Sequence, residues 1–112
     1  MNASKRKGTS WESAIVGYLR ERGWPYAERR ALSGNRDRGD VAGIAGVVIE
    51  AKAAKALDLA GWTAEAEAER VNDGAHLAAV WVKRRGKGSP ADGYVLLDGR
   101  TFVSLLKAGG YQ

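Results

Sequence analysis

One segment in the middle of the chain constrains the fold more than any other. Val47-Val48-Ile49-Glu50-Ala51-Lys52 is apolar and β-branched until its charged end, which predicts a buried strand. A helix should follow from about Asp58, a plausible N-cap, to Val71, where Asn72-Asp73-Gly74 ends it. Ala78–Val82 then predicts a second apolar strand. Two strands joined through a helix are expected to lie parallel, with a right-handed crossover.

The flanking sequence predicts the rest of an α/β fold. A helix is expected from about Ser10 to Arg22, because apolar residues such as Trp11 and Ile15 recur at helical spacing. Thr9 and Glu12 have the form of a capping box at its start. We expect further strands at Tyr26–Ala31, Asp40–Ala42 and Tyr94–Leu97, and a last helix at about Thr101–Ala108. The 112 residues therefore predict one α/β domain over residues 1–112, with a mixed central sheet flanked by helices in the order α-β-β-β-α-β-β-α.

The second expected helix has two patterned faces. Ala60, Ala64 and Ala68 form a stripe of small residues suited to close packing against a sheet. Its acidic residues are interpreted as a solvated face, with either Glu65 or Glu69 as the alternative that reaches a site on the sheet. The acidic residues in question are Glu65, Glu67 and Glu69.

Positive charge dominates the chain, which carries a formal net charge of +5. Its basic residues gather mostly in or beside expected loops, and residues 1–8 are expected to be a flexible basic arm. Basic loops that meet on one face would suit phosphate binding and favour a nucleic-acid partner over a merely solvated basic surface. The clusters are Lys5-Arg6-Lys7, Arg29-Arg30, Arg36 with Arg38, Lys52 with Lys55, and Lys83-Arg84-Arg85 with Lys87.

Several classes of protein are disfavoured by what the sequence lacks. There is no cysteine, so disulfide frameworks and thiolate metal sites are excluded. No apolar stretch is long enough for a signal peptide or a membrane span, which predicts a cytosolic protein. A single histidine, His76, disfavours a zinc site. No glycine-rich nucleotide loop and no Ser/His/Asp arrangement is present, so we expect neither a nucleotide cofactor nor acyl transfer.

The residues that carry chemistry are Asp40, Glu50 and Lys52. Glu50 and Lys52 lie two apart on a strand, so both side chains leave the same face. A hairpin through Gly43 and Gly46 can fold Asp40 back beside them. Two carboxylates are oxygen ligands for Mg²⁺ or Mn²⁺, and a lysine beside them can stabilise charge on a phosphoryl group. The trio is sufficient for phosphodiester hydrolysis; the alternative is a solvated strand end beside a turn aspartate.

Gly39-Asp40 followed by Val48-Ile49-Glu50-Ala51-Lys52 resembles the signature of the PD-(D/E)XK nucleases, with glycine in the place of the usual proline. More narrowly, Lys7-Gly8, Glu12, Arg29-Arg30 and Ser33-Gly34 together with the trio resemble Holliday-junction resolvases of the archaeal type and their phage-like relatives. The resemblance implies a restriction-endonuclease-like fold, a homodimer, and a role in DNA recombination or repair.

The resemblance also implies a role for each matched residue. Asp40, Glu50 and Glu12 would hold Mg²⁺ or Mn²⁺, and Lys52 would act on the nucleophile or the transition state. For Glu12, a capping role with Thr9 is the alternative. Either Arg29 or Arg30, with Ser33, would contact the cleaved strand. With the other basic clusters, the expected DNA-binding residues are Lys5, Arg6, Lys7, Arg29, Arg30, Ser33, Arg36, Arg38, Lys55, Arg84 and Arg85.

The sequence therefore predicts a metal-dependent, structure-selective DNA endonuclease that resolves four-way junctions as a homodimer. It would act in the cytoplasm, or in the host cytoplasm if the chain is phage-encoded. Two alternatives stay open. One is a nuclease that nicks or trims duplex or flap DNA with the same site, and the other is a non-catalytic DNA-binding module.

Overall fold

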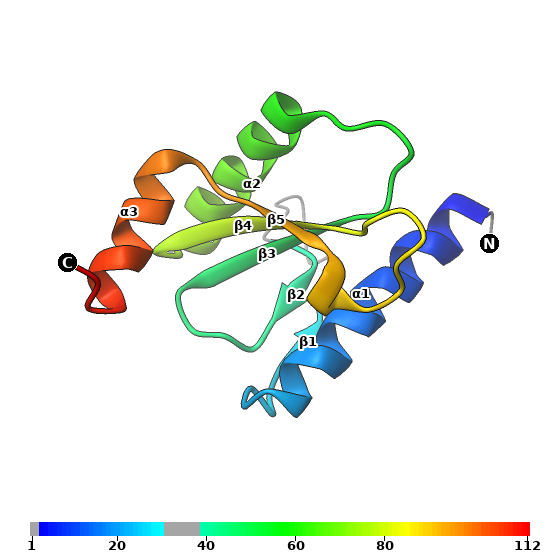
Figure 1. The fold of residues 1–112 in the computed structure, drawn as a ribbon, viewed down its shortest axis with the longest axis horizontal. Coiled ribbons are helices and arrows are strands. Elements are labelled where there is room, and N and C mark those ends of the chain that lie inside the picture. The colour runs from blue at the N-terminus through cyan, green and yellow to red at the C-terminus, as the bar shows by residue number, and fades with distance from the viewer. Residues whose placement is uncertain (1–2, 31–38) are drawn as a thin grey trace.

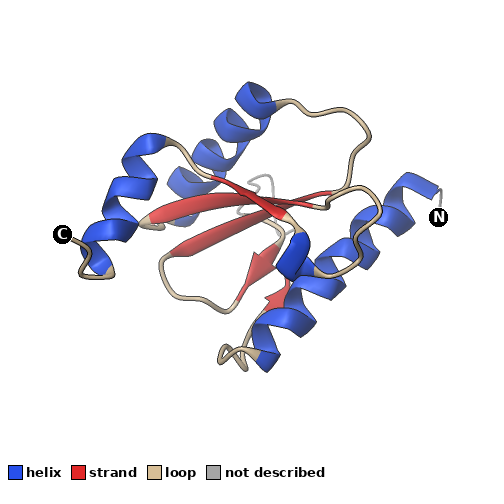
Figure 2. Cartoon of the chain, viewed as in Figure 1, coloured by secondary structure: helices blue, strands red, loops and turns tan. Residues whose placement is uncertain are grey.

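The computed structural model describes residues 3–30 and 39–112, with side chains from residue 6 onward. Three α-helices and five strands form an α/β fold, which confirms the expected class (Figures 1 and 2). The elements are α1 (Ala3–Glu21), β1 (Glu28–Arg29), β2 (Val41–Ala42), β3 (Val47–Lys52), α2 (Leu59–Asp73), β4 (Leu77–Val82), a 3-10 turn η1 (Pro90–Asp92), β5 (Tyr94–Leu96) and α3 (Gly99–Ala108).

The sheet is mixed, with its strands in the spatial order β1-β2-β3-β4-β5. The two central strands, β3 and β4, are parallel and pair along their whole length, from Val47 opposite Leu77 to Lys52 opposite Val82. All other neighbours are antiparallel. The sequence prediction of a parallel pair joined through a helix is confirmed. Because β3 and β4 run together, their carboxyl ends meet at one edge of the sheet.

Helices α1 and α2 lie on opposite faces of the sheet (Figure 1). The α1 face holds the larger apolar cluster, in which Trp11 and Ile15 pack against Ile49 of β3. The α2 face holds a smaller cluster, in which Trp62 packs with Val80 and Val82 of β4. Alternate residues of β3 therefore point to different helices, as the pleat of a strand requires.

Two expectations about helix α1 are wrong. The helix begins at Ala3 and not at about Ser10, so the backbone of residues 3–8 is helical. Thr9 is then an interior residue of the helix, and the capping box with Glu12 does not exist. Capping motifs require a residue with non-helical backbone at the N-cap, and a helical continuation upstream removes that condition.

The face that α2 turns to the sheet is also not the expected one. Its buried residues are Trp62, Ala66 and Glu69, whereas Ala60, Ala64 and Ala68 are exposed. Trp62 buries far more apolar surface than an alanine can, so the helix turns its tryptophan inward. Asp58 is the N-cap, as the sequence indicated, and accepts a hydrogen bond from the Gly61 N–H at 3.0 Å.

Smaller differences concern the edges of the sheet. The first strand is limited to Glu28–Arg29 instead of Tyr26–Ala31. Asp98 is the N-cap of α3 and accepts a hydrogen bond from the Thr101 N–H at 2.8 Å. Among the helices of residues 3–30 and 39–112, none combines the length and hydropathy that a membrane span needs.

Candidate active site

The end of β3 presents two charged side chains to helix α2. Ile49 packs into the apolar cluster on the α1 face, so its neighbour Glu50 points to the α2 face, and Lys52 follows it two residues later. Glu50 is only 4 % exposed, which is unusual for a carboxyl group. The strand thus carries an ionisable pair into the layer between sheet and helix.

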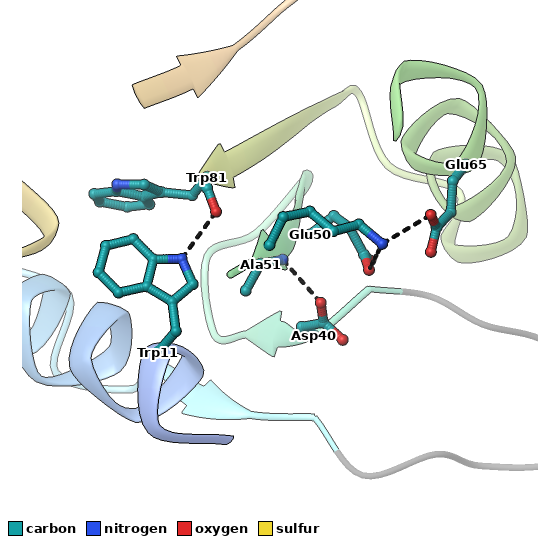
Figure 3. Close-up of polar contacts among 7 residues, drawn as sticks. Trp11, Asp40, Glu50, Ala51, Glu65 and Trp81 are labelled. Carbon is teal, nitrogen blue, oxygen red and sulfur yellow. Dashed lines mark hydrogen bonds and ion pairs between the residues drawn. The ribbon is translucent and has the colours of Figure 1, made fainter. Parts of the chain in front are cut away.

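Asp40 is held beside these residues by the β2–β3 hairpin. Its backbone N–H donates to the Ile49 carbonyl at 2.9 Å, and its own carbonyl accepts from the Arg30 N–H at 2.8 Å. The carboxylate turns back on β3, where Oδ2 accepts a hydrogen bond from the Ala51 N–H at 2.8 Å (Figure 3). Asp40 and Glu50, ten positions apart in sequence, are in this way brought together, as the sequence pattern predicted.

Gly39 explains why glycine precedes Asp40. Its φ of +98° lies in a region that residues with a side chain rarely adopt. A Cβ built there would lie 2.8 Å from Val48 Cγ1 and 3.2 Å from the Ile49 carbonyl oxygen. Proline, whose ring holds φ near −65°, has no place in this conformation. The chain therefore has glycine before Asp40, and not the proline of the signature that it resembles, because the backbone crosses closely over β3 at this point.

Helix α2 adds two carboxylates that the sequence pattern had offered only as an alternative. Lys52 Nζ lies 2.9 Å from Glu65 Oε2 and 3.6 Å from Glu50 Oε1. Glu69 is 2 % exposed and contacts Glu50. Glu67, by contrast, is exposed and pairs with Arg70, as a solvated face requires. The interpretation of all three as solvated is wrong for Glu65 and Glu69.

A signal for this existed in the sequence. Trp62, Ala66 and Glu69 follow the i, i+4, i+7 spacing of one helical face, and Glu65 lies beside that stripe. The alanine stripe competed with it and was the less apolar of the two. Once Trp62 is chosen as the buried anchor, Glu69 is buried with it.

Burial and crowded carboxyls disfavour the charged form of Glu50. Burial in the protein interior, followed by the contacts with Glu69 and Asp40, raises the pKa of Glu50 far above the ordinary glutamate value. Its Oε2 atom is buried and finds no hydrogen-bond partner in the described part of the chain. A buried oxygen without a partner costs free energy, so the cluster favours a ligand that supplies positive charge.

Lys52 remains cationic in this setting. Burial lowers the pKa of Lys52, but the hydrogen bond to Glu65 and the charges of Glu50, Glu65 and Asp40 outweigh it and raise the pKa above the ordinary value. Its ammonium group therefore bridges the β3 strand and α2.

Glu12 approaches the site from the α1 side. Burial, and then the negative charge of Asp40, raises the pKa of Glu12, while Arg29 acts in the opposite direction. Arg29 Nε lies 3.4 Å from Glu12 Oε1. Glu12 is thus an electrostatic neighbour of Asp40, across from the carboxylates of α2.

The residues fit a divalent cation. Within residues 3–30 and 39–112, one group of three carboxylates offers oxygen atoms that all lie within 4.8 Å of one another: Glu50, Glu65 and Glu69. Asp40 adjoins Glu50, whereas Asp40 and Glu12 lie outside this set of three. Carboxylate oxygens suit Mg²⁺ or Mn²⁺, and a cation would satisfy the buried Glu50 Oε2, which has no hydrogen-bond partner among the described residues.

The two arginines of the Arg29-Arg30 pair have different surroundings. Arg30 Nη1 forms an ion pair of 2.7 Å with Asp73 at the end of α2, and both side chains are about 20 % exposed, at 21 % and 20 %. Arg29 is more exposed, at 47 %, and its pair with Glu12 is longer. Arg84 stacks its guanidinium over the Tyr94 ring, 5.6 Å from the ring centre. Ser33, Arg36 and Arg38 and the Lys5 side chain lie outside the described part of the structure.

No family model, curated protein or solved structure matches the chain.

Proposed function

We propose that the chain is a divalent-metal-dependent DNA endonuclease of the PD-(D/E)XK type. The observation that carries the proposal is the convergence of Asp40, Glu50 and Lys52 at the end of β3 (Figure 3). Two further carboxylates, Glu65 and Glu69, close the cluster from α2. Five ionisable groups around one buried strand end are expensive to assemble without a chemical use, so their concentration favours a catalytic site.

Each residue of the cluster has a role in this proposal. Glu50, with Glu65 and Glu69 or with Asp40, holds the cation, and Asp40 is oriented for this by the Ala51 N–H. A bound Mg²⁺ or Mn²⁺ would neutralise phosphate charge and make a water molecule more acidic. Lys52 stabilises the negative charge that develops on the phosphoryl oxygens, since its ammonium group stays protonated.

The substrate is proposed to be DNA, because the chain carries a formal net charge of +5 and its basic residues gather in clusters along the sequence. More narrowly, we propose that the enzyme is a homodimer that resolves four-way junctions and acts in the cytoplasm. Two sites related by symmetry would cut opposed strands of a junction.

The proposal is tested by incubating labelled four-way junction, duplex and flap DNA with the protein in Mg²⁺, Mn²⁺ or EDTA. Paired symmetric nicks on the junction, dependent on metal, are the expected result. Cleavage of every duplex would keep the nuclease and remove junction selectivity. Tight binding without cleavage in any metal would leave only a DNA-binding module.

Substitutions separate the site from its surroundings. Asp40→Asn, Glu50→Gln and Lys52→Ala are each expected to reduce cleavage at least a hundredfold, in the range of a lost catalytic group or charge stabiliser, while DNA affinity changes little. Glu65→Gln and Glu69→Gln test the α2 carboxylates. Glu67→Gln is the matched control, because Glu67 lies on the same helix but pairs with Arg70. Wild-type rates for Asp40→Asn and Glu50→Gln would refute the site.

A further inference from the structure

Two neighbouring hollows meet at the carboxyl ends of β3 and β4. One, of about 430 Å³, lies between the first half of α1 and the loop after β4, and includes Arg6 in its lining. The other, of about 280 Å³, lies between the loops after β3 and β4, and is lined by Lys55 and Arg85 among others. Lys7 and Lys83 line both, so the hollows form one continuous surface, which we call the basic groove.

The groove is positively charged throughout. Its lining contains five basic side chains and, in the described structure, no carboxylate: Arg6, Lys7, Lys55, Lys83 and Arg85. None of the ion pairs found among residues 3–30 and 39–112 involves these five. Like charges around a shared hollow repel one another, and a polyanion relieves that repulsion. A third hollow, between α2 and α3, has a mixed lining of Glu67, Arg70, Asp98 and Arg100.

The groove begins where the acidic cluster ends. Ala53 and Ala54, which directly follow Lys52, form part of its wall. The Lys83 N–H donates a hydrogen bond of 2.8 Å to the Lys52 carbonyl, so the central lysine of the groove is fixed to the catalytic strand. Since consecutive Cα atoms lie about 3.8 Å apart, the three steps from Lys52 to Lys55 span at most about 11 Å. That distance covers only a few nucleotides of a DNA strand, which rises about 3.4 Å per nucleotide.

We propose that the basic groove binds backbone phosphates of the DNA on one side of the phosphate that is cleaved, with Lys7 and Lys83 as its central contacts. The assignment of DNA rests on the proposed function. Four residues of the groove, Arg6, Lys7, Lys55 and Arg85, are among the DNA-binding residues expected from the sequence. Lys83 was not among them, and the expected Arg84 contacts Tyr94 outside the groove. The structure thus separates the basic side chains that line the groove from Arg84, which does not line it.

The test measures binding of a short labelled DNA duplex in EDTA at a series of salt concentrations, using fluorescence anisotropy. The test variant is Lys7→Gln with Lys83→Gln. The control is Arg100→Gln with Lys107→Gln on α3, which removes the same charge at the opposite end of the molecule (Figure 1). The slope of log affinity against log salt is negative, and we expect it to be shallower by about two in the test variant. Each lost phosphate contact reduces the magnitude of the slope by about 0.9. The control should keep the wild-type slope.

Equal slopes for the two double variants would overturn the proposal, because the loss would then follow net charge alone. Thermal unfolding checks that both variants fold. If the Lys83 substitution prevents folding, Arg6→Gln with Lys7→Gln replaces it, since both of these side chains are exposed. The binding test does not depend on catalysis. If the slope changes as expected but the protein never cuts DNA, the groove proposal stands and the proposed nuclease function fails. If the protein cuts DNA but the test variant keeps the wild-type slope, the nuclease function stands and the groove proposal fails.

Discussion

At the scale of single residues, Glu50 is a buried carboxyl group in an unfavourable environment. Its carboxyl group is buried and contacts Glu69 and Asp40, and one of its oxygens has no hydrogen-bond partner within residues 3–30 and 39–112. Lys52 approaches the other oxygen at 3.6 Å but lies nearer to Glu65, so it does not satisfy Glu50 fully. The position is unfavourable for folding alone and favourable for holding a cation.

The raised pKa of Glu50 predicts how stability depends on pH. Without metal, the folded protein keeps Glu50 protonated above the unfolded-state value of about 4.5, where the unfolded chain releases the proton. The contribution of this group is therefore complete below that value and declines as pH rises toward the folded-state pKa. In EDTA, the Tm of wild type minus that of Glu50→Gln should become more negative from pH 5 to pH 8. At pH 8 the free energy of unfolding of Glu50→Gln should exceed that of wild type by about 1–3 kcal/mol, because the variant has no buried carboxyl group at this position.

Mg²⁺ provides the companion measurement. It should raise the Tm of wild type more at pH 8 than at pH 5, since cation and proton compete for Glu50, and should leave Glu50→Gln nearly unchanged. Glu67→Gln serves as the control. A Tm difference between wild type and Glu50→Gln that stays constant across this pH range would contradict the buried, protonated carboxyl.

At the scale of elements, the site is a junction of three pieces of chain. The β2–β3 hairpin supplies Asp40, strand β3 supplies Glu50 and Lys52, and α2 closes over them with Glu65. On the other face, α1 is fixed to β4 by a hydrogen bond of 3.0 Å from the Trp11 indole N–H to the Trp81 carbonyl (Figure 3). Hence α1 and α2 clamp the central strands from both sides.

Arg29 of β1 and Arg30, which directly follows this strand, are expected to differ in role, one in DNA binding and the other in stability. Arg29→Gln is expected to weaken DNA binding and to make the slope of log affinity against log salt shallower by about one. Stability should change little, because Arg29 is exposed. Arg30→Gln is expected to cost about 1–2 kcal/mol of stability, because it breaks the mostly buried ion pair with Asp73 that connects the chain after β1 to α2. Thermal unfolding and anisotropy on both variants check this, and the reverse assignment of effects would show that Arg30 is the DNA contact.

At the scale of the whole molecule, charge is divided between two adjoining regions. The acidic cluster lies between β3 and α2, and the basic groove lies at the ends of β3 and β4. A DNA strand bound in the groove, as proposed, would extend toward the carboxylates. Those carboxylates would repel the strand unless a cation were present, so binding and metal loading are expected to be coupled.

The proposed junction activity predicts a dimer, since one site per chain cannot cut two opposed strands at once. Sedimentation at assay concentrations should give the mass of two chains, each of 12.0 kDa, and with junction DNA the mass of two chains plus that of the DNA. A monomer that cuts single strands in duplex DNA would instead support the simpler nuclease with the same site.

The sequence by itself determined the α/β class, the parallel β3–β4 pair and the convergence of Asp40 with Glu50 and Lys52. These features depend on local patterns: an apolar strand with a charged end, a capped helix, and glycines that allow a tight hairpin.

Only the tertiary structure decided which face of α2 is buried, and with it the membership of Glu65 and Glu69. The sequence of α2 offers two competing stripes, and the structure buries the one that contains Trp62, which packs against Val80 and Val82 of β4. In the same way, neither the roles of Arg29 and Arg30 nor the union of loop lysines into one groove could be read locally, because each depends on a partner distant in sequence.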